Sequence, residues 1–396
     1  MTLQSKYSTP TSESSLHLDL VRGIAALLVM TSHFRLWFYV PYEELLSHKR
    51  LIVACFYWAT SGEIAHECVM VFFVLSGYLV GGSVLRAMNE NRWSWKDYLL
   101  RRGTRLYTVL FPALILTFVL DKICTYSSHY RETLQSVGRL SAIRSHGLSA
   151  FIGNLTFLQG VFVQPYGSNG ALWSLSYEFW YYIAFPCLAI MLLRRSSITA
   201  RLLAAGSLAF VLFLVGETIA IYGFVWLMGV AVHFVPPLES PRRIFRFTII
   251  AGSFMGLCVY TSIEKSGRLG PEKWHLLDVI LSLCVFIMIY GLLGPSRPIV
   301  NRYYKTVVRH LSSSSYTIYL THGPFLVVLV ALTRHHLWSP SLGTGVLGAL
   351  ALIVTFCYTQ LAYLCFERHT SQVLAFAKRL RVAAWSPLLV SKQTPS

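Results

Sequence analysis

The residues best suited to chemistry in this sequence begin with Arg22 and His33, because both fall well inside one apolar segment, residues 18–40. Ionisable side chains are costly inside a membrane and mark a functional site by default. Eleven residues make three helical turns plus about 20°, so both side chains lie on one helix face, about 16 Å apart along the axis. His33 then suits a general base. The simpler alternative is an arginine that reaches the interface and a hydrogen-bonded structural histidine.

Two acidic residues belong to other apolar segments. Glu67 lies at the start of residues 64–85, and Glu178 lies within residues 171–193. Because consecutive spans run in opposite directions, Glu67 is expected near the depth of His33. A carboxylate beside an imidazole holds its tautomer and stabilises the imidazolium, as a general base requires. A plain interfacial acid at a helix start is the alternative for Glu67.

Three arginines, Arg101, Arg102 and Arg105, lie where the apolar segment 103–120 begins. Arg102 and Arg105 are three residues apart and share a helix face. The planar guanidinium group suits the phosphates of a cytoplasmic cofactor. Anchoring of the span by positive charge on the cytoplasmic side explains the same cluster without any ligand.

The remaining candidates also have structural explanations. Trp173 and Tyr177 fit an interfacial aromatic belt, and His322, inside residues 314–332, fits a hydrogen-bonded structural histidine. The sequence has no phosphate-binding loop, no nucleophile elbow and no His/Cys cluster with metal-ligand spacing, so no metal site is predicted. The eight cysteines form no CxxC pair and are interpreted as small buried apolar residues.

Membrane helices are the elements that must position these residues. Apolar residues make up 55% of the chain and charged residues only 13%, which leaves too few charges to cover a soluble surface. A helix needs about 20 apolar residues to cross a bilayer. The ten predicted spans are residues 18–40, 64–85, 103–120, 171–193, 201–216, 218–235, 246–262, 276–293, 314–332 and 343–366. A shorter segment, residues 150–163, is predicted to be re-entrant or interfacial.

The distribution of basic residues predicts the orientation. A net charge of +17 would suggest nucleic acid in a soluble protein, but here the basic residues fall mainly in short connections between spans. Connections on one side carry 22 Lys and Arg, and those on the other side carry ten. Cytoplasmic loops carry the excess, so both termini are predicted to be cytoplasmic. The sequence therefore predicts an all-α polytopic membrane protein with about ten transmembrane helices and no nucleic-acid partner.

The domain organisation predicted from the sequence is simple. Residues 1–17 are expected to form a polar cytoplasmic tail without a cleavable signal peptide, and residues 18–370 the transmembrane domain. Residues 371–396 are expected to form a basic cytoplasmic tail, too short to bury a core of its own.

Five motifs in one consistent order resemble the membrane acyltransferase 3 family. They are the R-x10-H spacing of Arg22 and His33, FFVLSGYLV at 72–80, RRGTRLY at 101–107, LWSLSYEFWYY at 172–182 and SYTIYLTH at 315–322. The resemblance extends from residue 18 to residue 370. It implies a ten-helix enzyme of the bacterial plasma membrane that takes an acyl group, usually acetyl, from cytoplasmic acyl-CoA. The acceptor is a hydroxyl of a glycan or glycolipid, commonly at the outer face.

The resemblance also implies roles for the candidate residues. His33 becomes the general base or transient acyl carrier, with Glu67 and Glu178 as further catalytic residues. Many members carry an acidic residue where this chain has Met70, so an acid at Glu67 departs from that pattern. The expected contacts of acetyl-CoA are Arg22, Arg101, Arg102 and Arg105. The expected contacts of the acceptor substrate are Trp173, Tyr177 and His322.

Some members of the family carry an appended esterase-like domain, which this sequence is expected to lack. The chain then completes the transfer itself or passes the acyl group to a separate periplasmic partner, with membrane lipid around it. Two other classes of function stay open. One is a proton-coupled transporter that uses buried Arg, His and Glu as a relay, and the other is a lipid scaffold or sensor without chemistry. Transfer of label from acetyl-CoA to a glycan fraction distinguishes the enzyme from both.

Overall fold

The structure is a computed structural model that describes residues 12–45, 51–126, 132, 134–135, 145–193, 196–236, 248–253, 255–256, 258–259, 274–294, 301–333 and 336–390. Over these residues the chain is helical, with no strand and two isolated β-bridges. The α-helices are α1 (Ser12–Phe38), α2 (Leu51–Ala59), α3 (Gly62–Ser76), α4 (Gly82–Asn89), α5 (Trp95–Cys124), α7 (Leu148–Leu155), α8 (Leu172–Leu192), α9 (Ile198–Ala231), α11 (Trp274–Leu293), α12 (Arg302–Thr333), α13 (Leu342–Cys365) and α14 (Thr370–Val390). The other helical turns are η2 (Tyr42–Glu44), the π-helical η3 (Gly77–Gly81), η5 (Val232–Phe234) and η7 (Glu367–His369).

Seven helical stretches of the described residues are long and apolar enough to cross a membrane. They are Ser15–Phe38, Gly62–Asn89, Trp95–Cys124, Leu172–Leu192, Ile198–Phe234, Arg302–Thr333 and Leu342–Arg381. A shorter apolar helix, Leu277–Leu293, corresponds to the predicted span at 276–293. The all-helical, multi-pass character predicted from the sequence is thus confirmed. The count of ten crossings and the side of the membrane on which the termini lie stay predictions. Within the predicted span 246–262, only residues 248–253, 255–256 and 258–259 are described.

The predicted spans at 201–216 and 218–235 belong to a single helical element, α9. Gly216 interrupts it with φ 76° and ψ 179°, a conformation that glycine adopts without steric cost. Two helical halves therefore meet at Gly216, the last residue of the predicted span 201–216. The short segment predicted at 150–163 begins with α7 and continues as turns without further helix.

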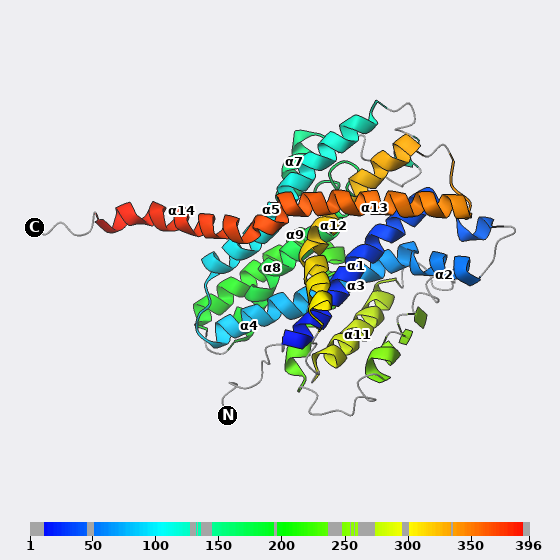
Figure 1. The fold of residues 1–396 in the computed structure, drawn as a ribbon. Helices are drawn as coiled ribbons and strands as arrows, with labels where there is room; N and C mark the ends of the chain where they lie inside the picture. Colours follow the sequence, from blue (N-terminus) through cyan, green and yellow to red (C-terminus); the bar gives the residue numbers. More distant parts are fainter. Residues whose placement is uncertain are drawn as a thin grey trace, which may run out of the picture.

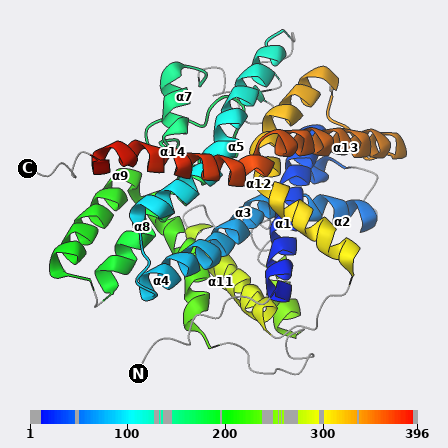
Figure 2. The same cartoon turned by 60° about the vertical axis from the view of Figure 1, so that its left-hand side comes forward.

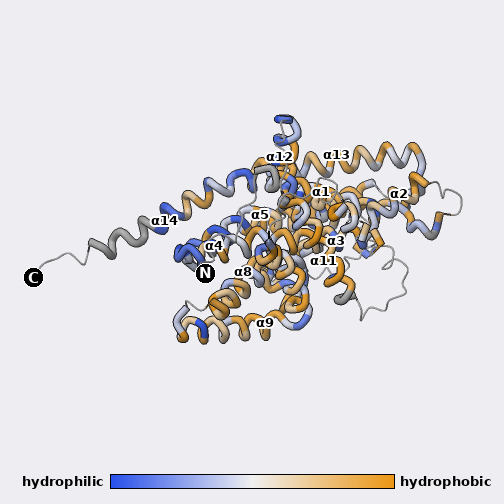
Figure 3. The backbone as a smooth tube through the Cα atoms, turned by 90° about the horizontal axis from the view of Figure 1, so that it is seen from below, coloured by the Kyte–Doolittle hydropathy of each residue, from blue (hydrophilic) through white to orange (hydrophobic). Residues whose placement is uncertain are grey.

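Three helices form the centre of the molecule. Helix α1 packs against both α3 and α12, and α8 packs against α9 (Figure 1). Most of the apolar stretches of α3 and α12 are buried, whereas the outer face of α13 exposes Leu347, Leu350 and Ile353. Apolar residues dominate α9 and α13 at the periphery (Figure 3). Such outward-facing apolar surfaces suit contact with lipid.

Small residues allow α3 and α9 to cross closely. A Cβ on Gly77 would lie 1.9 Å from the carbonyl oxygen of Trp226, and one on Gly229 would lie 1.9 Å from that of Val74. Close backbone approach at small residues is typical of helix pairs in membranes. The π-helical turn η3 begins at this crossing, and such turns often mark functional sites.

Helix α14 leaves the bundle and extends away from it (Figures 1 and 2). It is joined to the start of α5 by an ion pair in which Arg381 Nη1 lies 2.6 Å from Asp97 Oδ1. Residues 371–390 of the predicted C-terminal tail belong to this helix.

Candidate functional site

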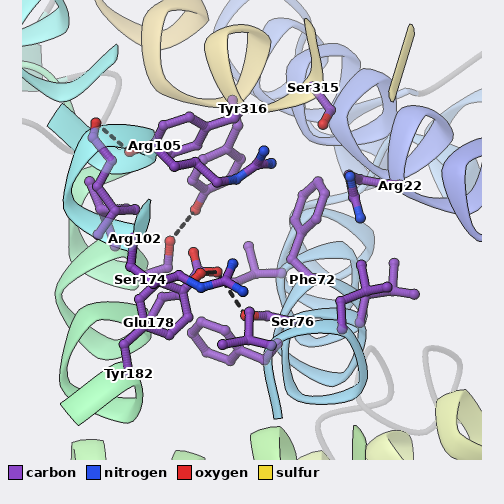
Figure 4. A pocket seen from close by; sticks show the side chains of 18 residues that line it. Arg22, Phe72, Ser76, Arg102, Arg105, Ser174, Glu178, Tyr182, Ser315 and Tyr316 are labelled. Carbon is purple, nitrogen blue, oxygen red and sulfur yellow. Dashed lines mark hydrogen bonds between the residues drawn. The ribbon is translucent and has the colours of Figure 1, made fainter. Parts of the chain in front are cut away.

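A cavity of about 230 Å³ lies between α1, α3, α5, α8 and α12. Four charged side chains from three of these helices line it, namely Arg22, Arg102, Arg105 and Glu178 (Figure 4). The hydroxyl groups of Ser76, Ser174, Ser315, Tyr182, Tyr316 and Tyr319 supply the other polar lining. A largely apolar protein therefore gathers three cations and one anion around one internal space.

The arginines of the cavity are held by polar and aromatic neighbours. Arg22 Nη1 donates to Ser312 Oγ at 3.4 Å, and Ser312 in turn donates to Asp19 at 2.7 Å. Arg102 donates to Ser83 Oγ at 3.2 Å, and its guanidinium lies 5.5 Å from the centre of the Tyr182 ring. The Nε of Arg102 is buried without a hydrogen-bond partner, so this guanidinium retains a donor for an anion.

Glu178 is oriented by two hydroxyl groups. Ser76 Oγ donates to Glu178 Oε1 at 2.8 Å, and the Tyr182 hydroxyl donates to the same oxygen. Trp226 Nε1 donates to Ser76 Oγ at 3.2 Å, which fixes the serine. Glu178 thus accepts hydrogen bonds as a carboxylate would, and its position beside the arginines limits the net positive charge of the cavity.

Two prolines near this site leave a helix carbonyl free to bond another segment of the chain. Pro186 in α8 and Pro324 in α12 lack the N–H that would bond the carbonyl four residues earlier. Those two carbonyls find other partners. The Tyr182 carbonyl accepts from the Tyr98 hydroxyl at 3.0 Å, and the Leu320 carbonyl accepts from Asn169 at 2.9 Å.

His33 forms a pair with His322. His33 Nδ1 lies 2.8 Å from His322 Nε2, and His322 Nδ1 lies 2.8 Å from the carbonyl oxygen of Ile318. A carbonyl only accepts, so His322 Nδ1 carries a proton, and a neutral His322 then accepts at Nε2. His33 must therefore donate through Nδ1, which gives a neutral His33 an unprotonated Nε2, the atom that a base or nucleophile uses. Trp37 stacks on the His33 ring at 5.2 Å.

Tyr319 connects the cavity to this histidine pair. It lines the cavity, and its hydroxyl lies 2.7 Å from Ser174 Oγ. The Tyr319 ring lies 6.3 Å from that of His322, whose ring lies 5.1 Å from that of His33. The arginine-lined cavity and the histidine pair are thus neighbouring parts of one region.

His33 and Glu67 lie at the same level of the bundle. Helices α1 and α3 run in opposite directions, and a Cβ on Gly62 would lie 3.3 Å from Leu36 Cδ1. His33 is one turn before Leu36, and residues 66 and 67 are about one turn after Gly62. Glu67 is buried at this level, and His33 has His322 as a hydrogen-bond partner.

The structure distributes the sequence-predicted residues over three neighbouring groups. The cavity gathers Arg22, Arg102, Arg105 and Glu178, the histidine pair joins His33 to His322, and Trp173 and Tyr177 pack together at 5.1 Å beside His66. Arg101 is exposed and is not among the residues that line the cavity. No group of three or more His, Cys, Asp or Glu suited to a metal ion occurs within the part of the chain that the structure describes.

Sequence reasoning missed several residues of this region. Ser76, Tyr182 and Tyr319 belong to the motifs quoted above, so their hydroxyls could have been considered from the sequence. Asp278 is the only charged residue of the apolar segment 276–293, which was a signal for a buried functional acid.

Comparison with known proteins decides the family. Residues 16–360 match the family model described as an acyltransferase domain. The chain belongs to the membrane acyltransferase 3 family. No solved structure matches it.

The relatives with names are acetyltransferases. The chain is 26% identical to the "Putative peptidoglycan O-acetyltransferase YrhL" of Bacillus subtilis, over 93% of this chain and 57% of that protein. It is 23% identical to the peptidoglycan O-acetyltransferase OatA of Listeria monocytogenes, over 83% of this chain and 55% of that protein. It is also 30% identical to an O-acetyl transferase of Shigella phage Sf6, over 42% of this chain and 43% of that protein. The chain thus spans little more than half the length of the relatives from Bacillus subtilis and Listeria monocytogenes.

Proposed function

We propose that this membrane protein transfers an acyl group, most simply acetyl, from acyl-CoA to a hydroxyl of a glycan at the bacterial plasma membrane. The observation that carries the proposal is the cavity lined by Arg22, Arg102 and Arg105 and linked through Tyr319 to the His33–His322 pair. Family membership and the names of the relatives support acyl transfer to a cell-wall glycan.

The arginines are proposed to hold the donor. Guanidinium groups bind phosphate oxygens in a planar, bidentate way, and CoA carries several phosphates. At about 230 Å³ the cavity is smaller than the usual pocket of a drug-sized ligand, so it suits the thioester end of the donor. The nucleotide would then lie at the mouth, near the exposed Arg101 and Arg105. Arg22 and His33 are separated by about 16 Å along α1, a separation suited to the long pantetheine arm.

The chemistry follows from the tautomer of His33. In direct transfer, Nε2 of His33 takes the proton of the acceptor hydroxyl while that oxygen attacks the thioester carbonyl carbon. A C–O bond forms, the C–S bond breaks, and the CoA thiolate leaves with the proton returned by the imidazolium. His322 keeps the tautomer of His33 throughout, as a positioning residue. Glu67, at the level of His33, is proposed to stabilise the imidazolium.

Transfer through an acyl-enzyme uses the same atom. Here His33 Nε2 attacks the thioester carbonyl, the C–S bond breaks, the thiolate leaves, and an acetyl-imidazolium that keeps the Nδ1 proton forms. The acceptor hydroxyl then attacks the acetyl carbon, a C–O bond forms as the C–N bond breaks, and neutral His33 leaves. The hydroxyl proton passes through Nε2 of His33 to the CoA thiolate. Labelled acetyl trapped on a peptide that contains His33, in the absence of acceptor, distinguishes this route from direct transfer.

The test is a transfer assay on the purified protein in nanodiscs. Acetyl-CoA labelled in the acetyl group is supplied with peptidoglycan fragments as the acceptor, and both labelled glycan and free CoA thiol are measured. Equal amounts of the two products are expected. If no label enters the glycan, but the same protein in sealed proteoliposomes moves protons across their membrane, the proposal is wrong and the protein is a transporter.

A further inference from the structure

A second polar cluster lies at the far end of α3 from the cavity arginines. His66 Nε2 lies 2.9 Å from Asp278 Oδ1, and the Tyr222 hydroxyl donates to Asp278 Oδ2 at 2.7 Å. The Asp278 side chain is only 4% exposed, whereas that of His66 is 31% exposed. Burying a carboxylate costs free energy of desolvation, which hydrogen bonds to its oxygens offset. Both oxygens of Asp278 have such a partner.

The carboxylate fixes the tautomer of His66. An ionised Asp278 only accepts, so His66 donates to it through Nε2, and a neutral His66 has an unprotonated Nδ1. This imidazole can therefore accept a hydrogen bond from a hydroxyl group. The arrangement differs from the His33–His322 pair, in which a second imidazole rather than a carboxylate holds the tautomer.

Two aromatic side chains, Trp173 and Tyr222, lie beside this imidazole, and further aromatic rings pack on Trp173. The ring of Trp173 is parallel to that of His66 within 12°, with the centroids 6.5 Å apart, and Tyr222 meets His66 edge-on at 6.2 Å. Tyr177 lies 5.1 Å from Trp173, and Phe73 lies 6.2 Å from Trp173. Aromatic faces next to a few convergent polar groups are the usual composition of a site for a small organic ligand, and amphipathic sugar rings fit it well.

The cluster is continuous with the proposed reaction site. His66, Val69, Phe73 and Ser76 follow one another at spacings of three or four residues, so they share one face of α3, and the last three line the cavity. At the other end of the same helical stretch, Ser83 accepts from Arg102. His66 also lies at the level of His33, because Gly62 and Leu36 are neighbours. The proposed donor site and the His66 cluster thus lie at opposite ends of one cavity-lining face.

We propose that His66, Asp278, Tyr222 and Trp173 form the acceptor subsite of the transfer reaction, which binds a hydroxylated sugar ring. His66 Nδ1 accepts a hydrogen bond from a sugar hydroxyl, Trp173 packs against the ring, and Asp278 and Tyr222 hold the imidazole. This inference rests on the proposed function and names the side chains that select a sugar as acceptor.

The test separates acceptor binding from donor binding. His66→Gln and Asp278→Asn are assayed in nanodiscs with labelled acetyl-CoA and the GlcNAc–MurNAc disaccharide of peptidoglycan as the probe. The acceptor KM should rise about 10-fold or more, as for loss of a hydrogen bond to a charged or charge-oriented group, while the acetyl-CoA KM stays unchanged. Trp173→Phe keeps an aromatic ring beside Tyr177 and tests the aromatic part of the subsite independently of the imidazole. It should also raise only the acceptor KM.

His146→Gln is the matched control. His146 Nε2 lies 2.8 Å from Oδ2 of the buried Asp121, a pair of the same chemistry, but Asp121 also accepts from the backbone N–H and the hydroxyl of Ser168. This variant should leave both KM values unchanged. An unchanged acceptor KM in folded His66→Gln and Trp173→Phe proteins, or an equal rise of both KM values, overturns the acceptor subsite. Absence of transfer by the wild-type protein would instead overturn the proposed function.

Discussion

At the scale of single residues, the pairing of His33 with His322 gives the sharpest prediction about catalysis. His33→Ala should lower transfer about 10²–10⁴-fold, the usual effect of removing a general acid–base group. His33→Gln retains hydrogen bonding but cannot move a proton, so it should be similarly inactive. The measurement is the initial rate of label transfer by protein that elutes as a folded species from gel filtration. Exposed His310, bonded to Gln360, is the control, and His310→Ala should keep the wild-type rate.

Two variants of the histidine pair can contradict the catalytic role of His33. Wild-type rates from His33→Ala would exclude both direct transfer and an acyl-enzyme on this residue. His322→Phe should reduce the rate as well, because it removes the acceptor that fixes His33 Nδ1 as the donor. Activity loss in His322→Phe without any loss in His33→Ala would place the chemistry on His322.

The cavity arginines give a prediction about donor binding. Arg102→Ala and Arg105→Ala should each raise the acetyl-CoA KM about 10–100-fold, since a hydrogen bond to a charged group contributes about 1.5–3 kcal/mol. Arg102→Lys should retain only part of the affinity for acetyl-CoA, because an ammonium group lacks the planar set of donors of a guanidinium group. Steady-state kinetics with varied acetyl-CoA provide the measurement. The control is Arg92→Ala, at a surface residue paired with Glu90, which should leave the acetyl-CoA KM unchanged. An unchanged acetyl-CoA KM in an Arg102/Arg105 double variant would indicate that these two arginines only anchor the helix in the membrane.

At the scale of helices, the crossing of α3 and α9 depends on glycine. Gly77→Ala or Gly229→Ala would push a Cβ to within 1.9 Å of a backbone carbonyl oxygen, which cannot move aside as a side chain would. Each change should destabilise the protein by about 1–3 kcal/mol, the range for overpacking, and lower the thermal-unfolding midpoint in detergent. Gly206 in α9 is the matched control, because a Cβ there meets nothing within 4 Å. Gly206→Ala should be neutral or slightly stabilising, and equal effects at all three glycines would contradict the close crossing.

The sequence predicts helices and their faces better than it predicts which faces meet. Apolar length identified the spans that α1, α5, α8 and α12 occupy, and the break at Gly216 coincides with the boundary between the predicted spans 201–216 and 218–235. The spacing of Arg22 and His33 predicted a shared face, and both side chains indeed contact α12, through Ser312 and His322.

Partners that are distant in the sequence could not be predicted in this way. His33 and His322 are 289 residues apart, and His66 and Asp278 are 212 residues apart. A helical period fixes the direction of a side chain relative to its own helix, but the neighbour is chosen by the packing of the whole bundle. For the same reason the sequence did not predict that Asp278 lies beside His66, or that His322 lies beside His33.

At the scale of the whole molecule, contacts place several chain segments at one end of the bundle. Helices α1 and α12 run in the same direction, because Arg22 meets Ser312 and His33 meets His322. The starts of these two helices therefore lie together. The start of α5 joins them through the shared cavity, and α14 follows through the ion pair between Arg381 and Asp97.

This shared end should face the cytoplasm. The predicted connections at this end carry most of the Lys and Arg residues, and positive charge is retained inside. In a variant without native cysteines, single cysteines at positions 302 and 379 should react with a membrane-impermeant maleimide only after the cells are permeabilised. A cysteine at Ser149, exposed at the start of α7, should react in intact cells. Labelling of position 379 from outside would invert the arrangement and separate the arginine-lined cavity from cytoplasmic acyl-CoA, so this measurement tests both the topology and the route of the donor.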